Sequence, residues 1–328
     1  MYRAGSLNSM TSKTSTDIPD LVSRSLQLAV LLEVSAYPKP GNVHRTSNFH
    51  QTSYEHYLAS AVALMPHFAH AAYRGAKASQ NKVALSRVGI GKIIKETVTD
   101  INVWQHGGNT LLGSVILLVP MATAAGFMLT ESSRFSVDGL RRDLKHVVEN
   151  TSTDDALNLY DAIALAQPGG LGKSPQLDVT DAKSKQEILE KHISLFDVFK
   201  ISAPWDSVSN EWVTNYPITF DIGYPFFFQQ LNGTRDINAV TVNTYLKILS
   251  LVPDSLIRRK AGTDKSKWVS DQAGRILEAG ALNTSEGRRR LRELDHRLHD
   301  ADHKLNPGTT ADLTSAVLAV AILGGYRP

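Results

Sequence analysis

Residues Leu111–Thr130 read LLGSVILLVPMATAAGFMLT, and these 20 positions include no charged side chain. The length approaches that needed to cross a bilayer. However, the stretch contains Gly113, Ser114 and Pro120, and it has neither a basic flank nor a belt of aromatic residues. A helix that is apolar on every face is also typical of the centre of a large helical core. We therefore predict a helix over residues 109–129, buried at the centre of a soluble protein and without contact with a membrane.

The rest of the chain shows an apolar period near 3.6 residues almost throughout, and strand-like alternation is scarce. A first helix is predicted to open at Asp17-Ile-Pro19, with proline in its first turn. The capping-box pattern Thr52-Ser-Tyr-Glu55 predicts the start of a second helix. No internal repeat or linker divides the chain, so we predict one all-α domain over residues 18–328. Further helices are predicted at 86–105, 137–149, 153–166, 181–199, 206–214, 237–250, 264–280, 285–303 and 310–323, with 201–236 as a main irregular region.

The composition is that of a globular protein, with 42% apolar and 20% charged residues in 328. Residues 1–17 are rich in Ser and Thr and lack the apolar region of a secretory signal, which predicts a disordered tail. The net charge is +3, and no aromatic residues are interleaved with the basic runs 258–260 and 288–290, so nucleic-acid binding is not expected. The absence of cysteine excludes disulfides and thiolate chemistry and fits a cytoplasmic protein. The oligomeric state stays open, a homodimer included.

Three short runs combine glycine with polar or charged side chains next to strongly helical stretches. They are Tyr37-Pro-Lys-Pro-Gly-Asn-Val-His44, Gly107-Gly-Asn-Thr-Leu-Leu-Gly113 and Asn306-Pro-Gly-Thr-Thr-Ala-Asp312. The first turn of a helix offers unpaired N–H groups and the positive end of the helix dipole, which suit an anion. Three such turns in one helical chain predict a shared site, most plausibly for a nucleotide, with Lys39, Asn109 and Asp312 at one cavity.

Each run also has a purely structural interpretation. Lys39 lies between two prolines that stiffen the backbone, so it can meet a phosphate or can be an exposed lysine in a turn that ends a helix. Asn109 and Thr110 can cap the apolar helix, and the same helix start can accept an anion. Asp312 is expected in the first turn of the last helix. There it can complement the helix dipole, or it can act as a general base or magnesium ligand.

In an all-helical chain of this size, the three runs resemble the motifs of the triphosphoribosyl-dephospho-CoA synthase family. Members carry Pro-Lys-Pro-Gly, Asn-Thr-x-x-Gly and Pro-Gly-x-x-Ala-Asp-Leu in this order. The motifs stand here at Pro38–Gly41, Asn109–Gly113 and Pro307–Leu313, and Pro168–Gly172 and Asp254–Lys260 are weaker matches. The resemblance covers nearly the whole chain after residue 20.

The chain departs from the citrate-lyase-associated members at two places. Those members show Asp at the position of His44 and His-Lys at the position of Leu111-Leu112. The versions found here resemble a divergent branch of archaea and methylotrophs. The difference concerns the identity of the acceptor more than the use of ATP.

The resemblance implies transfer of the triphosphoribosyl group of ATP to the ribose 2′-OH of dephospho-CoA, or of a similar small-molecule acceptor, with release of adenine. Mg²⁺ is expected with the phosphates, and its ligands stay open. We assign Asp312 and His44 to catalysis, Asp312 as the base or a metal ligand and His44 as an orienting group. The predicted nucleotide-binding residues are Lys39, Gly41, Asn42, Asn109, Thr110, Gly113, Arg258, Lys260 and Asn306.

Two alternatives belong to other functional classes. His296, His299, Asp300 and His303 share one helix face, and with His44 and Asp312 they could form a metal-dependent phosphohydrolase site. Residues 285–304 are so highly charged, however, that a solvated amphipathic helix explains them better. The other alternative is a nucleotide-binding module without catalysis.

Overall fold

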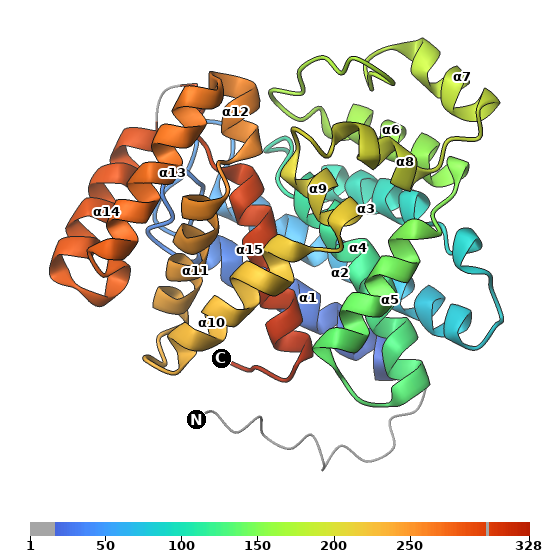
Figure 1. The fold of residues 1–328 in the computed structure, drawn as a ribbon, viewed down its shortest axis with the longest axis horizontal. Coiled ribbons are helices and arrows are strands. Elements are labelled where there is room, and N and C mark those ends of the chain that lie inside the picture. Colours follow the sequence, from blue (N-terminus) through green and yellow to red (C-terminus); the bar gives the residue numbers. More distant parts are fainter. Residues whose placement is uncertain (1–16, 300–301) are drawn as a thin grey trace.

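The central helix lies where the sequence predicts it. In a computed structural model, which describes residues 17–299 and 302–328, α4 (Leu112–Ser132) is surrounded by other helices (Figure 1). By length and composition α4 could cross a bilayer, but 89% of its most apolar window is buried inside the protein. The prediction of a core helix is confirmed. The helix begins three residues later than expected, since residues 109–111 form a turn.

Close packing against α2 (Tyr54–Ser79) holds α4 in place, and two glycines make it possible. A Cβ on Gly126 would lie 2.0 Å from the carbonyl oxygen of Ala72, and a Cβ on Gly75 would lie 1.9 Å from that of Thr123. Any side chain at either position would force the two backbones apart. The other long helices of the core are α1 (Asp17–Ser35) and α15 (Gly308–Leu323), and α15 is buried on nearly every face.

Figure 1 shows α15 between two groups of helices. On one side a second apolar cluster joins α11 (Ile237–Leu251), α13 (Thr263–Glu278) and α14 (Ser285–Leu298). On the other side lie α2, α4 and the helices that follow α4 in the sequence. The described residues form fifteen α-helices and no β-strand, which confirms the all-α fold. The remaining ones are α3 (Ile90–Trp104), α5 (Val137–Glu149), α6 (Thr153–Ala166), α7 (Ala182–Glu190), α8 (Leu195–Ser202), α9 (Ser207–Thr214), α10 (Tyr224–Leu231) and α12 (Ser255–Ala261).

Several predicted boundaries were wrong for local reasons. The helix expected over 181–199 is two helices, because His192 has a left-handed backbone with φ 51° and Ser194 caps α8. The helix expected from residue 86 begins at Ile90, after Gly89 with φ 81°. The helix expected to reach residue 303 ends at Leu298.

Two further expectations about segments need correction. The region 201–236 is not irregular, since α9, a π-helical turn at Ile218–Gly223 (η3) and α10 occupy most of it. The box expected at Thr52–Glu55 is shifted by one residue, so that the backbone N–H of Ser53 donates to His56 Nδ1 at 2.9 Å. Residues 1–16 of the predicted tail lie outside the described part, and Asp17 already belongs to α1.

Candidate active site

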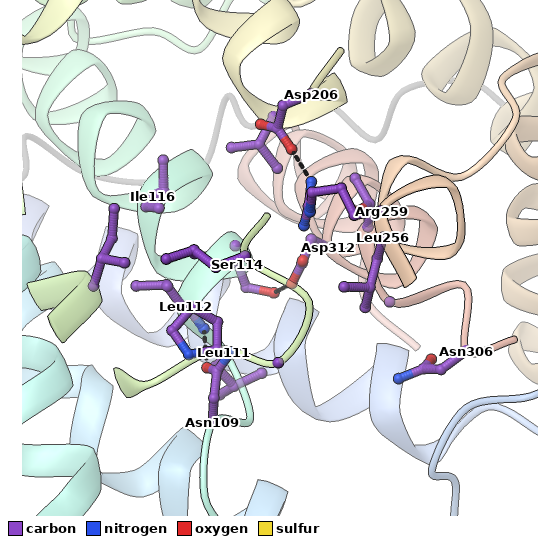
Figure 2. A pocket seen from close by; sticks show the side chains of 18 of the residues that line it. Asn109, Leu111, Leu112, Ser114, Ile116, Asp206, Leu256, Arg259, Asn306 and Asp312 are labelled. Atoms are coloured by element: carbon purple, nitrogen blue, oxygen red, sulfur yellow. Dashed lines mark hydrogen bonds and ion pairs between the residues drawn. The ribbon is translucent and has the colours of Figure 1, made fainter. Parts of the chain in front are cut away.

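The three glycine-containing runs meet at one cavity of about 560 Å³. Lys39 from the first run, Asn109 from the second and Asp312 from the third all line it, although they are far apart in the sequence. Figure 2 shows Asn109 and Leu112 on the α4 side of this cavity and Asp312 between them and Asn306. Separate helix caps would have no reason to face one another. The structure therefore shows that the three turns border one common space.

Asp312 is held in the wall of this cavity by α4. Its Oδ1 accepts a hydrogen bond of 2.6 Å from Ser114 Oγ, and the side chain is partly buried. Loss of hydration raises the pKa of Asp312 to about 7, against the opposing effect of Ser114, and the charge of Glu33 adds to the rise. A carboxyl group with this pKa can take up and release a proton near neutral pH.

Capping of α15 belongs to another residue, Asp254. Its Oδ2 accepts from the backbone N–H of Thr310 at 2.7 Å and from its hydroxyl at 2.8 Å. Its Oδ1 accepts from Leu256 N at 2.8 Å and so also caps α12. Asp312 lies four residues beyond Gly308, the first residue of α15, and not in the first turn as predicted. The dipole interpretation of Asp312 therefore loses its basis.

Gly113 makes room for the carboxyl group of Asp312. A Cβ at this position would lie 2.1 Å from Asp312 Oδ2, which no packing adjustment of a short, hydrogen-bonded side chain could accommodate. Gly113, which the sequence assigns to the nucleotide, lines the cavity. It also lets α4 approach α15 at the level of Asp312.

Lys39 is buried, not exposed as its turn alone would suggest. Its side chain is 2% exposed and forms an ion pair with Glu33, whose side chain is 4% exposed. Lys39 Nζ also donates to the backbone oxygen of Glu33 at 3.1 Å. Burial raises the pKa of Glu33, although the Lys39 charge acts in the opposite direction. Much of the Lys39 charge is therefore neutralised within the protein.

Gly41 and His44 lie outside the residues that line the cavity. The N–H of Gly41 donates to Asp295 Oδ1 at 3.0 Å, and His44 Nε2 lies 3.3 Å from Asp295 Oδ2. Burial disfavours the charge on Asp295, but hydrogen bonds from His299 and His44 hold its pKa at about 2. These contacts tie the 36–53 loop to α14. Because Asp295 contacts both the Gly41 N–H and His44, neither group is directed at a ligand.

The other predicted polar residues of the first two runs do border the cavity. Asn42 Nδ2 donates to the hydroxyl of Tyr245 at 2.7 Å, which fixes the first turn against α11. Asn109 Oδ1 accepts from Leu112 N at 3.2 Å, so it supports the start of α4. The hydroxyl of Thr110 lies 2.8 Å from that of a serine on α2.

The α12 residues that line the cavity include Arg259 and Lys260 but not Arg258. Arg259 donates to Asp206 at 2.7 Å and to the carbonyl of Gly170 at 3.2 Å, which brings the 168–172 loop to the cavity. Arg258 was the wrong member of the basic run because adjacent residues on a helix point in different directions. The cavity is also lined by Ser114, Glu33 and Tyr57, which no motif in the sequence predicted.

The structure offers no support for a metal-dependent phosphohydrolase. Among residues 17–299 and 302–328, no three His, Asp or Glu side chains are grouped so that they could hold a metal ion. His299 Nε2 lies 3.0 Å from the hydroxyl of Ser47, and its Nδ1 lies 3.1 Å from Asp295. Asp300 of the predicted His-Asp pair lies outside the described residues.

Comparison with known proteins agrees with the motifs. A model of the ATP:dephospho-CoA triphosphoribosyl transferase family (CitG) matches residues 19–328. This chain belongs to that family. The family resemblance inferred from the three runs is thereby confirmed.

Several curated relatives from Pseudomonas carry the name "Probable 2-(5''-triphosphoribosyl)-3'-dephosphocoenzyme-A synthase". The Pseudomonas paraeruginosa protein is 35% identical over 99 residues, which are 29% of this chain and 33% of the relative. The Pseudomonas fluorescens protein is 26% identical over 306 residues, covering 92% of this chain and 91% of the relative. The first of these alignments thus spans only about a third of the relative.

A crystal structure from Archaeoglobus fulgidus, named for triphosphoribosyl-dephospho-CoA synthase, shares the fold. It superposes with a TM-score of 0.60 at 22% identity and covers 82% of this chain and 100% of its own. At that identity the similarity concerns the fold alone.

Proposed function

We propose that this chain transfers the triphosphoribosyl group of ATP to a hydroxyl acceptor and releases adenine. The observation that carries the proposal is the placement of Asp312. Its carboxyl group lines a cavity large enough for a nucleotide, caps no helix and has a pKa of about 7. Membership of the transferase family supplies the reaction class.

In this reaction the bond between C1′ of the ribose and N9 of adenine breaks, and a bond forms between C1′ and the acceptor oxygen. The acceptor hydroxyl loses its proton, and adenine leaves with one. We assign to Asp312 the removal of the hydroxyl proton, because a general base works best when its pKa lies near the working pH. Ser114 donates a 2.6 Å hydrogen bond to this carboxyl group, which favours its ionised form.

The triphosphate is assigned to the start of α4 at Asn109 and Thr110 and to Arg259 of α12. Of the described residues that line the cavity, three carry a cationic side chain (Lys39, Arg259 and Lys260) and four carry a carboxyl group (Glu33, Asp206, Asp302 and Asp312). This lining cannot neutralise a triphosphate by itself, so the substrate is expected to enter with a cation.

The polar lining fits Mg²⁺, because its donors are carboxylate, amide and hydroxyl oxygens. When bound, Mg²⁺ would offset phosphate charge. The remaining parts of the proposal are dephospho-CoA or a similar small molecule as acceptor, a cytoplasmic location and a single domain over residues 18–328.

The decisive experiment is incubation of the protein with ATP, Mg²⁺ and dephospho-CoA, followed by mass spectrometry of the products. Release of adenine together with a triphosphoribosylated acceptor is the expected result. Release of phosphate without adenine would instead identify a hydrolase. Tight ATP binding without any product would leave a binding module and reject the transferase.

A further inference from the structure

The side-chain amide of Asn306 lies at the cavity, and the described part of the chain leaves its oxygen unpaired. This residue lines the cavity in the turn that leads into α15, and its Oδ1 is buried without a hydrogen-bond partner among the described residues. A buried polar atom without a partner destabilises the folded protein, because it has lost its hydrogen bonds to water. Such an atom is unusual in a native protein and is explained when a ligand supplies the missing partner.

An aromatic pair lies on the same cavity. The rings of Phe49 and His303 stack with centroids 3.9 Å apart and planes 22° apart, and both residues line the space that Asn306 borders. A flat heterocycle can stack on such a pair, because every nucleobase has a π-face. His303 and Asn306 belong to the same turn. A stacking surface and an unsatisfied amide therefore occur together.

We propose that Asn306, together with the Phe49–His303 pair, binds the adenine of ATP and selects it over purines with an oxygen at C6. An Asn side chain matches adenine in two ways: its oxygen accepts from the N6 amino group and its NH₂ donates to N7. This inference rests on the proposed use of ATP and names the residues that recognise its base.

The position of Asn306 relative to Asp312 agrees with this assignment. Asp312 lies four residues beyond the start of α15, or about 6 Å along the helix axis at 1.5 Å per residue. A purine whose N6 and N7 edge meets Asn306 can therefore direct N9, and the C1′ bonded to it, towards Asp312. The triphosphate then extends to the wall that carries Asn109, on the other side of Asp312 in Figure 2.

The test compares the binding of ATP and inosine triphosphate, each with Mg²⁺, by titration calorimetry. Inosine triphosphate carries an oxygen at C6, which would face Asn306 Oδ1 without a proton between them. We expect the wild type to prefer ATP by about tenfold or more. Asn306→Leu has a similar shape and removes no side-chain hydrogen bond made by the described residues, so its melting temperature should not fall. Its preference for ATP should drop to near one, mainly through weaker ATP binding.

Asn109→Asp is the matched control on the opposite wall. The new carboxylate can still accept from Leu112 N, but its charge repels phosphate, so both nucleotides should bind more weakly and the preference should persist. An unchanged preference in Asn306→Leu, or no preference in the wild type, would overturn the inference while adenine release still supported the transferase. Selective loss of ATP binding in Asn306→Leu without any adenine release would retain the adenine pocket and reject the proposed reaction.

Discussion

Asp312 and Glu211 both have a pKa raised to about 7, and in each case burial is the largest cause. Their surroundings are nevertheless different. Glu211 is 0% exposed, and its two oxygens accept from Ile218 N, Thr219 N and Thr219 Oγ1 at 2.7, 3.0 and 2.5 Å. Those bonds hold the start of the π-helical turn. Asp312 lines the cavity and accepts from the side chain of Ser114.

The comparison shows that a shifted pKa alone does not mark a reactive group. Desolvation produces the same shift in a carboxyl group that organises the backbone and in one that faces a ligand space. The difference lies in what surrounds the oxygens. Both oxygens of Glu211 accept hydrogen bonds from the backbone of Ile218 and Thr219. Asp312 lines the cavity, and α15 is capped by Asp254.

The largest expected effect is on kcat, which should fall when Asp312 is replaced and not when Glu211 is replaced. Asp312→Asn removes the proton acceptor and keeps the size of the side chain. We expect kcat for adenine release to fall by roughly 10²- to 10⁴-fold, the range for loss of a general base. Glu211→Gln should retain kcat in the folded fraction, because Glu211 does not border the cavity. Steady-state kinetics of both variants would contradict the comparison if Glu211→Gln lost as much as Asp312→Asn.

Glu33 is a third buried acid, and it differs from Asp312 and Glu211 because it forms a buried ion pair with Lys39. If Lys39 only bound the nucleotide, as its sequence context predicts, Lys39→Ala would weaken ATP binding and leave the fold intact. The structure changes this expectation, since the variant leaves Glu33 buried without its partner. We expect a loss of about 3–5 kcal/mol in the free energy of unfolding, measured with urea. The double variant Lys39→Met, Glu33→Gln should recover much of it, and a single variant as stable as wild type would show that the pair is not desolvated.

The third prediction concerns stability and its pH dependence. Glu211→Gln places an NH₂ group where an oxygen now accepts N–H groups, which should lower the free energy of unfolding by about 1–3 kcal/mol.

For Asp312 the folded pKa of about 7 exceeds the ordinary value of 3.8. Its contribution to stability is therefore present below pH 3.8 and is lost as the pH rises to 7. Asp312→Asn does not titrate. Its melting temperature relative to wild type should therefore be higher at pH 8 than at pH 5, and a constant difference would contradict the raised pKa.

The sequence predicted the all-α fold and the central helix well, because a helix that is uncharged on every face is stable only where it is shielded from water on all sides. It also predicted that Lys39, Asn109 and Asp312 would share a cavity, from the way glycine turns precede helices. It could not show that Gly41 and His44 face Asp295, since that contact joins residues about 250 positions apart. The choice between neighbours such as Arg258 and Arg259 depends on how α12 is rotated, and the tertiary packing decides it.

The smallest expected effect tests the hydrogen bond that Ser114 donates to Asp312. Ser114→Ala removes a hydrogen bond that favours the ionised carboxylate, so the pKa of Asp312 should rise further. The base must be ionised to act, and the activity of the wild type should therefore fall as the pH drops below about 7. In Ser114→Ala this fall should begin about one pH unit higher, with about tenfold lower kcat/KM at pH 6 and near-normal values at high pH. Thr123→Val is the control, because it removes another hydroxyl of α4 that bonds only to the backbone of Val119. Equal loss of activity at every pH in Ser114→Ala would mean that Ser114 positions the substrate or the helix, and that the state of Asp312 does not limit the reaction.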